Sequence, residues 1–554
     1  MGRPSKLRPV PAGPNRREFF KRSGGAAALV ASAAALPLGA EAGHQPFQHG
    51  VASGDPLSDR VMLWTRVTPQ NPKEDIHGFY VVATDPALTQ VVRSGKFSTS
   101  VDVDYTVHVD AKGLQPGTTY YYRFQFKQKF SAIGRTRTLP VGSVDRLRMA
   151  VVSCSNFAAG YFNAYRCIAQ RSDLDLVIHL GDYIYEYGTG QYGTVRPCEP
   201  SNEAVSLSDY RTRHAQYKRD PDLQEMQRQH PLVAIWDDHE TANNAWQGGA
   251  ENHQPATEGD WATRVAGALQ AYYEWMPVRR QDPSNPRRNN RQVSVGNLVD
   301  LFMLEERLNA RSEQVSQSNA AANFSQTGSY LDPARSLLGS EEEQWLIQGL
   351  RSSGARWRVI GQGVMFAQLK VKGATNAEGG GVFLNDDQWD GYQPARDRIF
   401  AALGGTDGGA AVRNAVILTG DIHSAWAADL TPDPNNPDVA SGGYNPRSGA
   451  GSVAVEFVAT SVTSAGIPDP DGTLTQLAKS QNPHFKHVDL LHHGYMLLDV
   501  TPQRLSTEFW SLATVESPDT TQTLSAVWQV MDGAAHLSAG SPSTPVVNPP
   551  APAP

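Results

Sequence analysis

Residues 174–186 read Leu-Asp-Leu-Val-Ile-His-Leu-Gly-Asp-Tyr-Ile-Tyr-Glu, a short apolar run that ends in Gly181 and Asp182. An apolar run of this length with Gly and Asp after it is typical of a buried strand. A helix-like stretch over 159–171 precedes it. Similar runs that end in small or polar residues lie at 147–152, 231–236, 357–360 and 415–419. Buried strands that alternate with helices predict an α/β domain.

The chain before this region has a different pattern, which predicts a second domain. From residue 47 to residue 139 it reads as short strands, such as 61–67 and 119–126, separated by Gly, Pro and Asp turns. This pattern is typical of a β-sandwich. We therefore expect four regions after residue 42: a small N-terminal β-sandwich domain (43–140), a catalytic domain (145–513), a C-terminal extension (514–540) and a disordered Pro-rich tail (541–554).

The composition is that of a soluble globular protein, with 40% hydrophobic and 19% charged residues among 554. The formal net charge of −7 argues against a nucleic-acid-binding module, because binding to a phosphate backbone normally needs a basic face. It does not argue against chemistry on phosphate esters, because bound cations can supply local positive charge. Three cysteines, Cys154, Cys167 and Cys198, are too few for a disulfide framework.

Residues 1–42 carry the pattern of an export signal. The pair Arg16-Arg17 is followed by two Phe and a Lys, then by an Ala-rich run over 24–40 and an Ala-Glu-Ala cleavage pattern. A transmembrane anchor is the alternative, but the run is short and rich in Ala and Gly for a bilayer span. We expect a twin-arginine signal peptide that the twin-arginine export machinery recognises. Cleavage would leave no stable membrane anchor and place the mature protein in the periplasm or outside the cell.

Chemically active side chains follow four of the predicted strands. In strand order they are Cys154; Asp182 and Tyr185; the run Asp237-Asp238-His239-Glu240; and Asp421 and His423. Each alone has an ordinary explanation, since a buried Cys is usually a small hydrophobe and Gly-Asp is often a turn. Ligands, however, collect beyond the carboxyl ends of strands in open α/β sheets. We therefore expect these side chains to converge, and their thiol, carboxylate, phenol and imidazole groups predict a metal site.

Three of these motifs resemble those of the calcineurin-like metallophosphoesterases. They are Gly-Asp-x-x-Tyr at 181–185, Asp-Asp-His-Glu at 237–240 and Gly-x-x-His at 420–423. With Ser153-Cys154 in the first motif, the chain looks like an alkaline phosphatase of the PhoD type, and the resemblance runs from residue 47 to residue 510. It implies an α/β metallophosphoesterase sandwich, with two mixed β-sheets flanked by helices, and a small N-terminal all-β sandwich domain.

The resemblance also implies a ligand set for a dinuclear metal site: Cys154, Asp182, Tyr185, Asp238, Asp421 and His423. Asp182 is expected to bridge the two metals. The thiolate and phenolate of Cys154 and Tyr185 suit Fe³⁺. The carboxylates of Asp238 and Asp421 suit a hard cation such as Ca²⁺, and the resemblance implies the same two ions. The role given to Asp238 is open to a neighbour, Asp237 or Asn244.

The expected activity is hydrolysis of phosphate esters by an exported metal-dependent enzyme, an alkaline phosphatase or phosphodiesterase that serves phosphate acquisition. A metal-activated hydroxide is expected to attack phosphorus in line, with Asp182 and His239 as catalytic residues. His239 would stabilise the transition state or protonate the leaving group; its alternative role is to orient a ligand. The expected substrates are small-molecule phosphate esters, and the preference between monoesters and diesters stays open.

Two further residues are predicted to bind the substrate. Arg307 ends a Leu-Glu-Glu-Arg run at 304–307, where the family's usual run is closer to Leu-Asp-Thr-Arg. Its alternative role is a structural ion pair. Asn244 lies shortly after the Asp-Asp-His-Glu run, and its alternative role is that of a neutral oxygen ligand of calcium.

Three other functions compete with this interpretation. The nearest is a phospholipase-D-like phosphodiesterase acting on lipid head groups, although we find no basic amphipathic helix that would hold the protein on a membrane. The second is a non-catalytic cell-surface binding protein, which the intact ligand set disfavours. The third is a thiol enzyme with Cys154 as nucleophile, and the local run Ser-Cys-Ser-Asn provides no general base for it.

Overall fold

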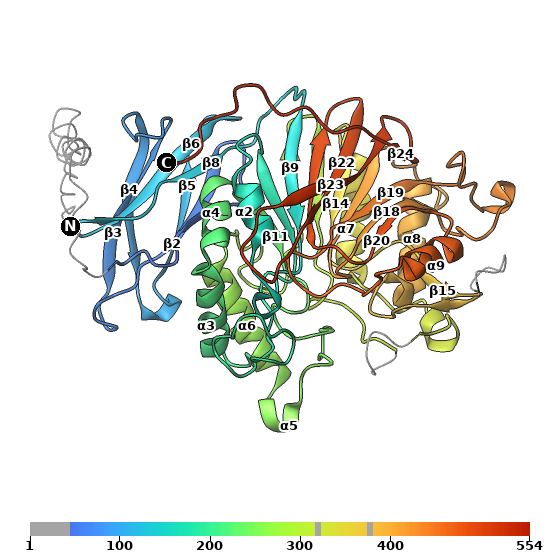
Figure 1. Cartoon of the computed structure of the whole chain (residues 1–554), viewed down its shortest axis with the longest axis horizontal. Helices are drawn as coiled ribbons and strands as arrows, with labels where there is room; N and C mark the ends of the chain where they lie inside the picture. The colour runs from blue at the N-terminus through green and yellow to red at the C-terminus, as the bar shows by residue number, and fades with distance from the viewer. Residues whose placement is uncertain (1–44, 316–322, 374–379) are drawn as a thin grey trace, which may run out of the picture.

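The computed structural model describes residues 45–315, 323–373 and 380–554. It shows two large β-sheets packed face to face, helices on their outer sides, and a smaller β region at one end (Figure 1). The predicted export signal at 1–42 lies outside the described residues. Within the described ranges, no helix combines the length and the apolar character that a membrane crossing requires.

The larger sheet has ten strands, and its centre is parallel. The parallel strands are β9 (Leu147–Val152), β10 (Leu176–Leu180), β11 (Pro231–Ile235) and β1 (Val51–Gly54). Every residue of these four strands is buried, which explains why their sequences are continuous apolar runs. The antiparallel flanks are β21 (Gly494–Val500), β22 (Arg504–Leu512), β23 (Gln522–Met531) and β24 (Leu537–Ala539) on one side, and β2 (Arg60–Arg66) and β5 (Thr106–Lys112) on the other.

The smaller sheet has seven strands and is also mixed. Its parallel strands are β13 (Val299–Met303), β14 (Trp357–Gly361), β17 (Ala415–Thr419) and β19 (Ala454–Val458). Its antiparallel strands are β12 (Arg291–Val295), β18 (Ala425–Leu430) and β20 (Phe485–Asp489). A short hairpin of β15 (Lys370–Lys372) and β16 (Val382–Phe383) stands apart from both sheets.

The two sheets enclose one core, and helices cover their outer faces. Ile178 and Leu180 of β10 pack in the same cluster as Val359 of β14 and Val416 of β17. Against the larger sheet lie α2 (Asn163–Ala169), α3 (Leu207–Lys218), α4 (Pro221–Gln229) and α6 (Trp261–Trp275). Against the smaller sheet lie α7 (Gly339–Ser352) and α8 (Gln393–Gly404). The predicted sandwich of two mixed sheets flanked by helices is therefore confirmed.

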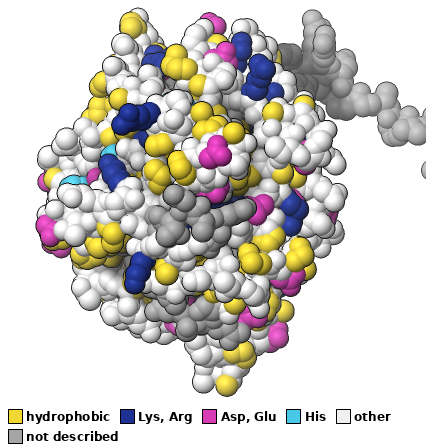
Figure 2. All heavy atoms as spheres, turned by 90° about the vertical axis from the view of Figure 1, so that its right-hand side faces the viewer, with side chains coloured by type: hydrophobic (Ala, Val, Ile, Leu, Met, Phe, Trp, Pro, Cys, Tyr) yellow, Lys and Arg dark blue, Asp and Glu magenta, His cyan; other side chains and the backbone are white. Residues whose placement is uncertain are grey.

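Two shorter helices are α5 (Pro255–Glu258), which precedes α6, and α9 (Thr473–Gln481), which packs against β15 and β20. The face that carries α8 and α9 shows basic, acidic and apolar side chains dispersed among one another (Figure 2). This mixture of both signs agrees with the modest net charge of the chain, −7 over 554 residues.

The N-terminal β region is confirmed, but it shares a sheet with the catalytic domain. Its own sheet contains β4 (Val91–Thr99), β3 (Ile76–Ala83), β6 (Thr119–Phe126), β7 (Lys129–Phe130) and β8 (Gly134–Arg137). The sheet that faces it is the far end of the ten-stranded sheet, because Val61 and Leu63 of β2 pack with Val82 of β3 and Phe124 of β6. The two regions are thus joined through the hydrogen bonds of one continuous sheet.

The C-terminal residues differ from the prediction. The extension at 514–540 supplies β23 and β24 to the larger sheet. The tail at 541–554 is an extended segment docked on the protein (Figure 1), where disorder was expected. The Thr544 carbonyl accepts from Arg148 Nη1 at 2.8 Å, and Ala553 and Gln229 exchange hydrogen bonds at 2.9 and 3.0 Å. An extended Pro-rich backbone has no internal hydrogen bonds, so its carbonyls are available to arginine and glutamine side chains from distant parts of the chain.

Candidate metal centre

The predicted site residues meet at the carboxyl ends of parallel strands from both sheets. Cys154 follows β9, Asp182 follows β10, Asp238 follows β11, and Asp421 and His423 follow β17. The two sheets face each other, so their strand ends form a common edge. The convergence expected from strand order is present in the structure, whereas the roles assigned to the individual residues stay predictions.

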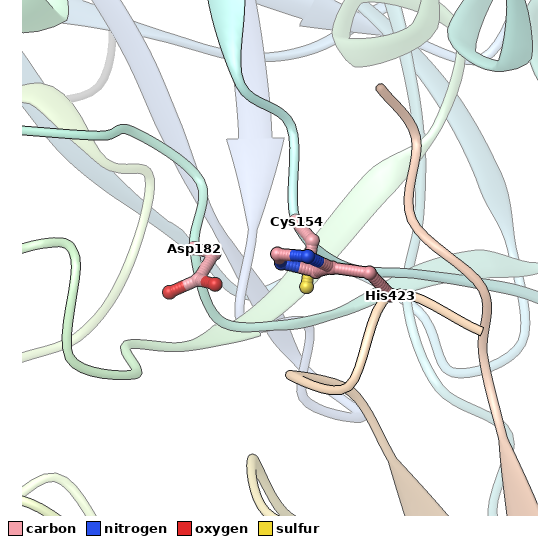
Figure 3. Close-up of side chains that lie close together, drawn as sticks. All are labelled: Cys154, Asp182 and His423. Carbon is pink, nitrogen blue, oxygen red and sulfur yellow. The ribbon is translucent and has the colours of Figure 1, made fainter. Parts of the chain in front are cut away.

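The first group of donors is a thiol, a carboxylate and an imidazole. One ligand atom each from Cys154, Asp182 and His423 lies within 4.8 Å of the others, and Figure 3 shows these side chains coming from three separate strand-end loops. The Tyr185 hydroxyl joins them: it donates to Asp182 Oδ2 at 2.9 Å and lies 3.2 Å from His423 Nε2. Ser464 Oγ is 2.6 Å from the same hydroxyl. This set offers one sulfur, one nitrogen and two kinds of oxygen.

The second group of donors is mostly carboxylate. Asp238 clusters with Asp182 and His239, and also with Asp237 and Asp421, each time within 4.8 Å. Of the two neighbours that were alternatives to Asp238, Asp237 is already held by Arg307 at 2.5 and 3.1 Å. The other, Asn244, donates its backbone N–H to Asp238 Oδ2 at 2.6 Å. Asp238 belongs to both clusters of this second group, which favours it over these two neighbours as the predicted ligand.

Five of the site residues have a left-handed backbone conformation. Their φ angles are 59° for Cys154, 54° for Asp182, 53° for Asn244, 60° for Asp421 and 56° for His423. Residues other than glycine rarely adopt this conformation, and it costs on the order of 1 kcal/mol or more each. The surrounding packing must therefore stabilise it. Asp, Asn and His are among the residues enriched at left-handed positions, whereas Cys is not, so residue type alone did not predict this shared feature.

Glu240 is a functional residue that sequence reasoning left without a role. Its carboxylate accepts the backbone N–H groups of Asp182, Tyr183 and Asp237 at 3.1, 2.6 and 2.8 Å. Burial raises the pKa of Glu240 to about 8, although these hydrogen bonds act in the opposite direction. One side chain therefore holds the loops after β10 and β11 in register. Its place in the Asp-Asp-His-Glu run was the only available signal.

His239 is held by an acidic partner that the sequence interpretation also missed. Its Nδ1 lies 2.7 Å from Glu186 Oε2, and its ring stacks on Tyr185 with 4.1 Å between centroids. Burial alone would lower the pKa of His239, but Glu186, Asp238 and Asp182 together raise it well above its usual range. A protonated imidazole beside the carboxylate cluster can donate a proton, which is the chemistry expected of a general acid.

The structure buries Arg307 among the carboxylates of the cluster. Its side chain has no exposed surface, and it donates to Asp237 at 2.5 Å, to Asp387 at 2.7 Å and to Asp421 at 3.1 Å. These contacts form the ion-pair network that was the alternative role, and the contact with substrate stays a prediction. Five guanidinium N–H groups in a fixed fork suit this task, because they can serve several carboxylates at once.

The two glutamates before Arg307 explain the departure from the usual run. Glu306 Oε2 accepts the backbone N–H groups of Gly363 and Val364 at 2.8 and 3.2 Å. Glu305 Oε1 accepts from the Trp236 indole at 2.8 Å. Both carboxylates therefore hold neighbouring loops, and neither faces the cluster as an extra charge.

The electrostatics of the cluster fit bound cations. Burial is the main cause that raises the pKa values of Cys154, Tyr185, Asp182 and Asp421 well above their usual ranges, and neighbouring acidic groups add to it. Asp238 is the exception, because Arg307 and His239 outweigh its burial and hold its pKa low. Positive charge placed among these groups would favour their ionised forms. The donor chemistry and the burial thus both suit metal ions.

Comparisons with known proteins agree with this geometry. The family model of the PhoD-like phosphatases matches residues 149–509. The family model of the PhoD-like phosphatase N-terminal domain matches residues 31–140. Alkaline phosphatase D of Bacillus subtilis (strain 168) is 36% identical over 487 residues, which cover 85% of this chain and 79% of that protein. A solved structure of PhoD superposes with a TM-score of 0.81 at 34% identity, covering 91% of this chain and 94% of that one. The resemblance inferred from the motifs is confirmed: this chain belongs to the PhoD-like phosphatases and is a phosphoric ester hydrolase.

Proposed function

We propose that this hydrolase depends on metal ions held by the strand-end side chains and acts outside the cytoplasm to acquire phosphate. The observation that carries the proposal is the convergence of Cys154, Asp182 and His423 within 4.8 Å, with the Tyr185 hydroxyl bonded to Asp182. A buried thiol, phenol and carboxylate that meet a half-buried imidazole form an unusual set for a structural core, and a well-suited one for a metal.

The two donor groups differ in a way that supports two unlike ions. Cys154, Tyr185 and His423 offer anionic sulfur and oxygen with nitrogen, which suits Fe³⁺. Asp238 and Asp421 offer only carboxylate oxygen, which suits Ca²⁺. Asp182 lies in one cluster with Cys154 and His423 and in another with Asp238 and His239. This position supports its role as the bridging ligand. Bound cations of this kind supply Lewis acidity, which lowers the pKa of water and neutralises charge on a phosphoryl group.

The remaining chemistry falls to side chains of this chain. His239, fixed through Nδ1 by Glu186 at 2.7 Å, has Nε2 left to donate a proton to the departing alkoxide. The stacking of Tyr185 on the His239 ring limits its rotation, and Glu240 keeps Asp182 and Asp237 in place. Arg307 acts as a positioning residue, because it donates to Asp421 Oδ1 at 3.1 Å.

The thiol-enzyme alternative fits the structure less well. Burial, together with the charge of Asp182, raises the pKa of the Cys154 thiol well above its usual range. A nucleophilic cysteine needs the opposite shift, towards the thiolate at neutral pH. A ligand role is compatible with this environment, because a bound cation favours the thiolate.

Hydrolysis assays before and after metal removal test the function. The purified protein is expected to hydrolyse 4-nitrophenyl phosphate or bis(4-nitrophenyl) phosphate, and the relative rates decide between monoester and diester preference. Chelation is expected to lower the rate at least about 100-fold, and Fe³⁺ with Ca²⁺ to restore it. Full activity of a fully chelated protein would contradict metal dependence.

Export rests on the sequence pattern of residues 1–42 alone, which carries the Arg16-Arg17 pair and the Ala-Glu-Ala cleavage pattern. Fractionation of producing cells decides it. The enzyme is expected in the periplasm or the medium, with its N-terminus after Ala42. An enzyme confined to the cytoplasm at full length would contradict the proposal.

A further inference from the structure

The hydroxyl of Tyr192 lies at the edge of the metal centre and is outside the candidate ligand set. Tyr192 belongs to the loop that follows Glu186, and its side chain is half-buried. Its ring is stacked with that of His239 at 6.3 Å between centroids and lies 6.4 Å from the ring of His423. The hydroxyl oxygen is 3.4 Å from His423 Nδ1. Tyr192 therefore lies beside both the candidate proton donor and a candidate metal ligand.

The hydrogen bonds of His423 leave the proton of the Tyr192 hydroxyl unused. His423 Nδ1 lies 3.1 Å from the Ala465 carbonyl oxygen, and a carbonyl oxygen can only accept a hydrogen bond. Nδ1 therefore carries a proton and has no lone pair for the Tyr192 O–H. The same tautomer keeps the Nε2 lone pair for a metal ion, as the proposed ligand role requires. Nδ1 can at most share its N–H with the Tyr192 oxygen, which then accepts.

No other acceptor takes this proton among residues 45–315, 323–373 and 380–554, because the contact with His423 Nδ1 is the one hydrogen-bond contact of the Tyr192 hydroxyl there. The hydroxyl of Tyr185, which also lies against His423, differs in this respect, since it donates to Asp182 Oδ2 at 2.9 Å. Packing of the Tyr192 ring alone would be served equally well by phenylalanine. Its hydroxyl is therefore a donor available to a ligand of the metal centre.

Two tight contacts hold the Tyr192 loop in place. Asn156 Nδ2 donates to the Tyr192 carbonyl at 2.6 Å, and Asn156 is buried. Gly193, the next residue, has a φ of 125°, and a Cβ there would lie 2.6 Å from the carbonyl carbon of Ala158. Glycine permits this close approach of two backbones. The hydroxyl is thus positioned before a substrate binds, and a donor fixed in advance can stabilise developing charge without reorganisation.

The position of the Tyr192 hydroxyl separates its partner from that of His239. His239 lies in the candidate cluster that contains Asp238, whereas His423 lies in the one that contains Cys154. The Tyr192 hydroxyl contacts His423, and only the Tyr192 ring stacks beside His239. The two donors therefore border different groups of ligands. A phosphate ester has a leaving oxygen and non-bridging oxygens, so donors in two places can serve both kinds.

We propose that the Tyr192 hydroxyl donates a hydrogen bond to a non-bridging phosphoryl oxygen of the substrate. There it stabilises the negative charge that the equatorial oxygens share in the transition state. A hydroxyl that donates to an ionised oxygen forms a charge-assisted bond, which is stronger than one between neutral groups. The proposal rests on the function proposed for the metal centre, because the phosphoryl group is bound there.

Tyr192→Phe tests the proposal, because it removes the hydroxyl and keeps the ring. We expect kcat/KM of the holoenzyme for phosphate esters to fall about 10–100-fold. The Kd for inorganic phosphate, measured by titration calorimetry, should rise about tenfold. Iron and calcium contents should equal those of the wild type, because no ligand is changed. Tyr161→Phe is the matched control: Tyr161 is also half-buried and lies over the Arg196 guanidinium, and its replacement should leave both quantities unchanged.

Two esters with different leaving groups separate a phosphoryl contact from a contact with the leaving oxygen. 4-Nitrophenolate leaves without a proton, whereas the alkoxide of propyl phosphate needs one. A donor to a phosphoryl oxygen should therefore give Tyr192→Phe the same fold-loss in kcat/KM for 4-nitrophenyl phosphate and for propyl phosphate. An equal loss supports the proposal. A larger loss for propyl phosphate would assign the hydroxyl to the leaving group and overturn it.

The outcomes also separate this proposal from the function on which it rests. Wild-type kcat/KM and phosphate affinity in Tyr192→Phe would overturn the role of the hydroxyl alone. Loss of iron from this variant would overturn it as well, because the side chain would then act through His423. A wild-type protein that hydrolyses no ester would overturn the function of the metal centre. The phosphate titration decides the hydroxyl even in that case, since equal or absent binding in wild type and Tyr192→Phe overturns its role. Equal unfolding temperatures of both variants and the wild type show that folding is intact.

Discussion

Replacement of Asp182 by asparagine is expected to lower kcat/KM for phosphate esters by about a thousandfold or more. Substitution of a residue that merely supports a metal ligand typically costs about 10–100-fold in metal affinity or activity. Asp182 should cost more, because it lies in two candidate ligand clusters, one with Cys154 and His423 and one with Asp238 and His239. An amide of the same shape loses the negative charge that both cations need. Steady-state assays on a monoester and a diester, together with metal analysis of the variant, measure the effect.

Stability measurements show whether this loss is local. Asp182 is 1% exposed and sits among other acidic groups, so removal of its charge relieves repulsion in the metal-free protein. The metal-free variant should therefore unfold at the same temperature as the metal-free wild type, or at a higher one. Asp145→Asn, the same change at an exposed position before β9, is the matched control and should retain activity. An Asp182→Asn variant with near-normal activity would remove Asp182 from the site.

Replacement of Arg307 by alanine is expected to lower the stability of the protein, which is the second large effect. Arg307 is fully buried and bonds Asp237, Asp387 and Asp421. Removal of one partner from a buried ion pair leaves uncompensated charge and typically destabilises by about 3–5 kcal/mol. We expect a loss of this size in the free energy of unfolding of the holoenzyme, measured by urea titration. Activity should fall too, because Asp421 loses the group that orients it.

An exposed ion pair provides the matched comparison. Arg356 lies 3.1 Å from Asp532, and the two side chains are 49% and 37% exposed. Such pairs contribute about 0–1 kcal/mol, so Arg356→Ala should change stability little. Arg307→Lys should lie between the two, because it keeps the charge and loses the planar fork. Equal small effects of Arg307→Ala and Arg356→Ala would show that the buried network does not stabilise the site.

The fold and the outline of the site were predictable because strand ends carry a strong signal. Cys154, Asp182, Asp238 and Asp421 each follow an apolar run that forms a parallel strand, and parallel strands bring their carboxyl ends to one edge. The sequence order of these runs was therefore enough to predict that the side chains converge. Family motifs supplied the two-sheet architecture, which periodicity alone does not specify.

What escaped prediction depends on contacts between residues far apart in the chain. The pairing of β1 with β11 joins Ser53 to Pro231, and no local pattern encodes such a register. The docking of the tail depends on Arg148 and Gln229, whereas composition alone suggested disorder. A single sequence likewise does not show that Arg307 pairs with three carboxylates, Asp237, Asp387 and Asp421, because these lie 70 or more residues away from it.

The central claim is that the strand-end side chains hold iron and calcium, and the metal content of the enzyme tests it most directly. Wild-type protein and Cys154→Ser are purified without chelators and analysed side by side by mass spectrometry for metals, with activity measured on the same samples. The account predicts iron and calcium together in the wild type, and loss of iron with activity, but not of calcium, in Cys154→Ser. A fully active wild-type protein that contains only zinc, or no metal, would contradict it.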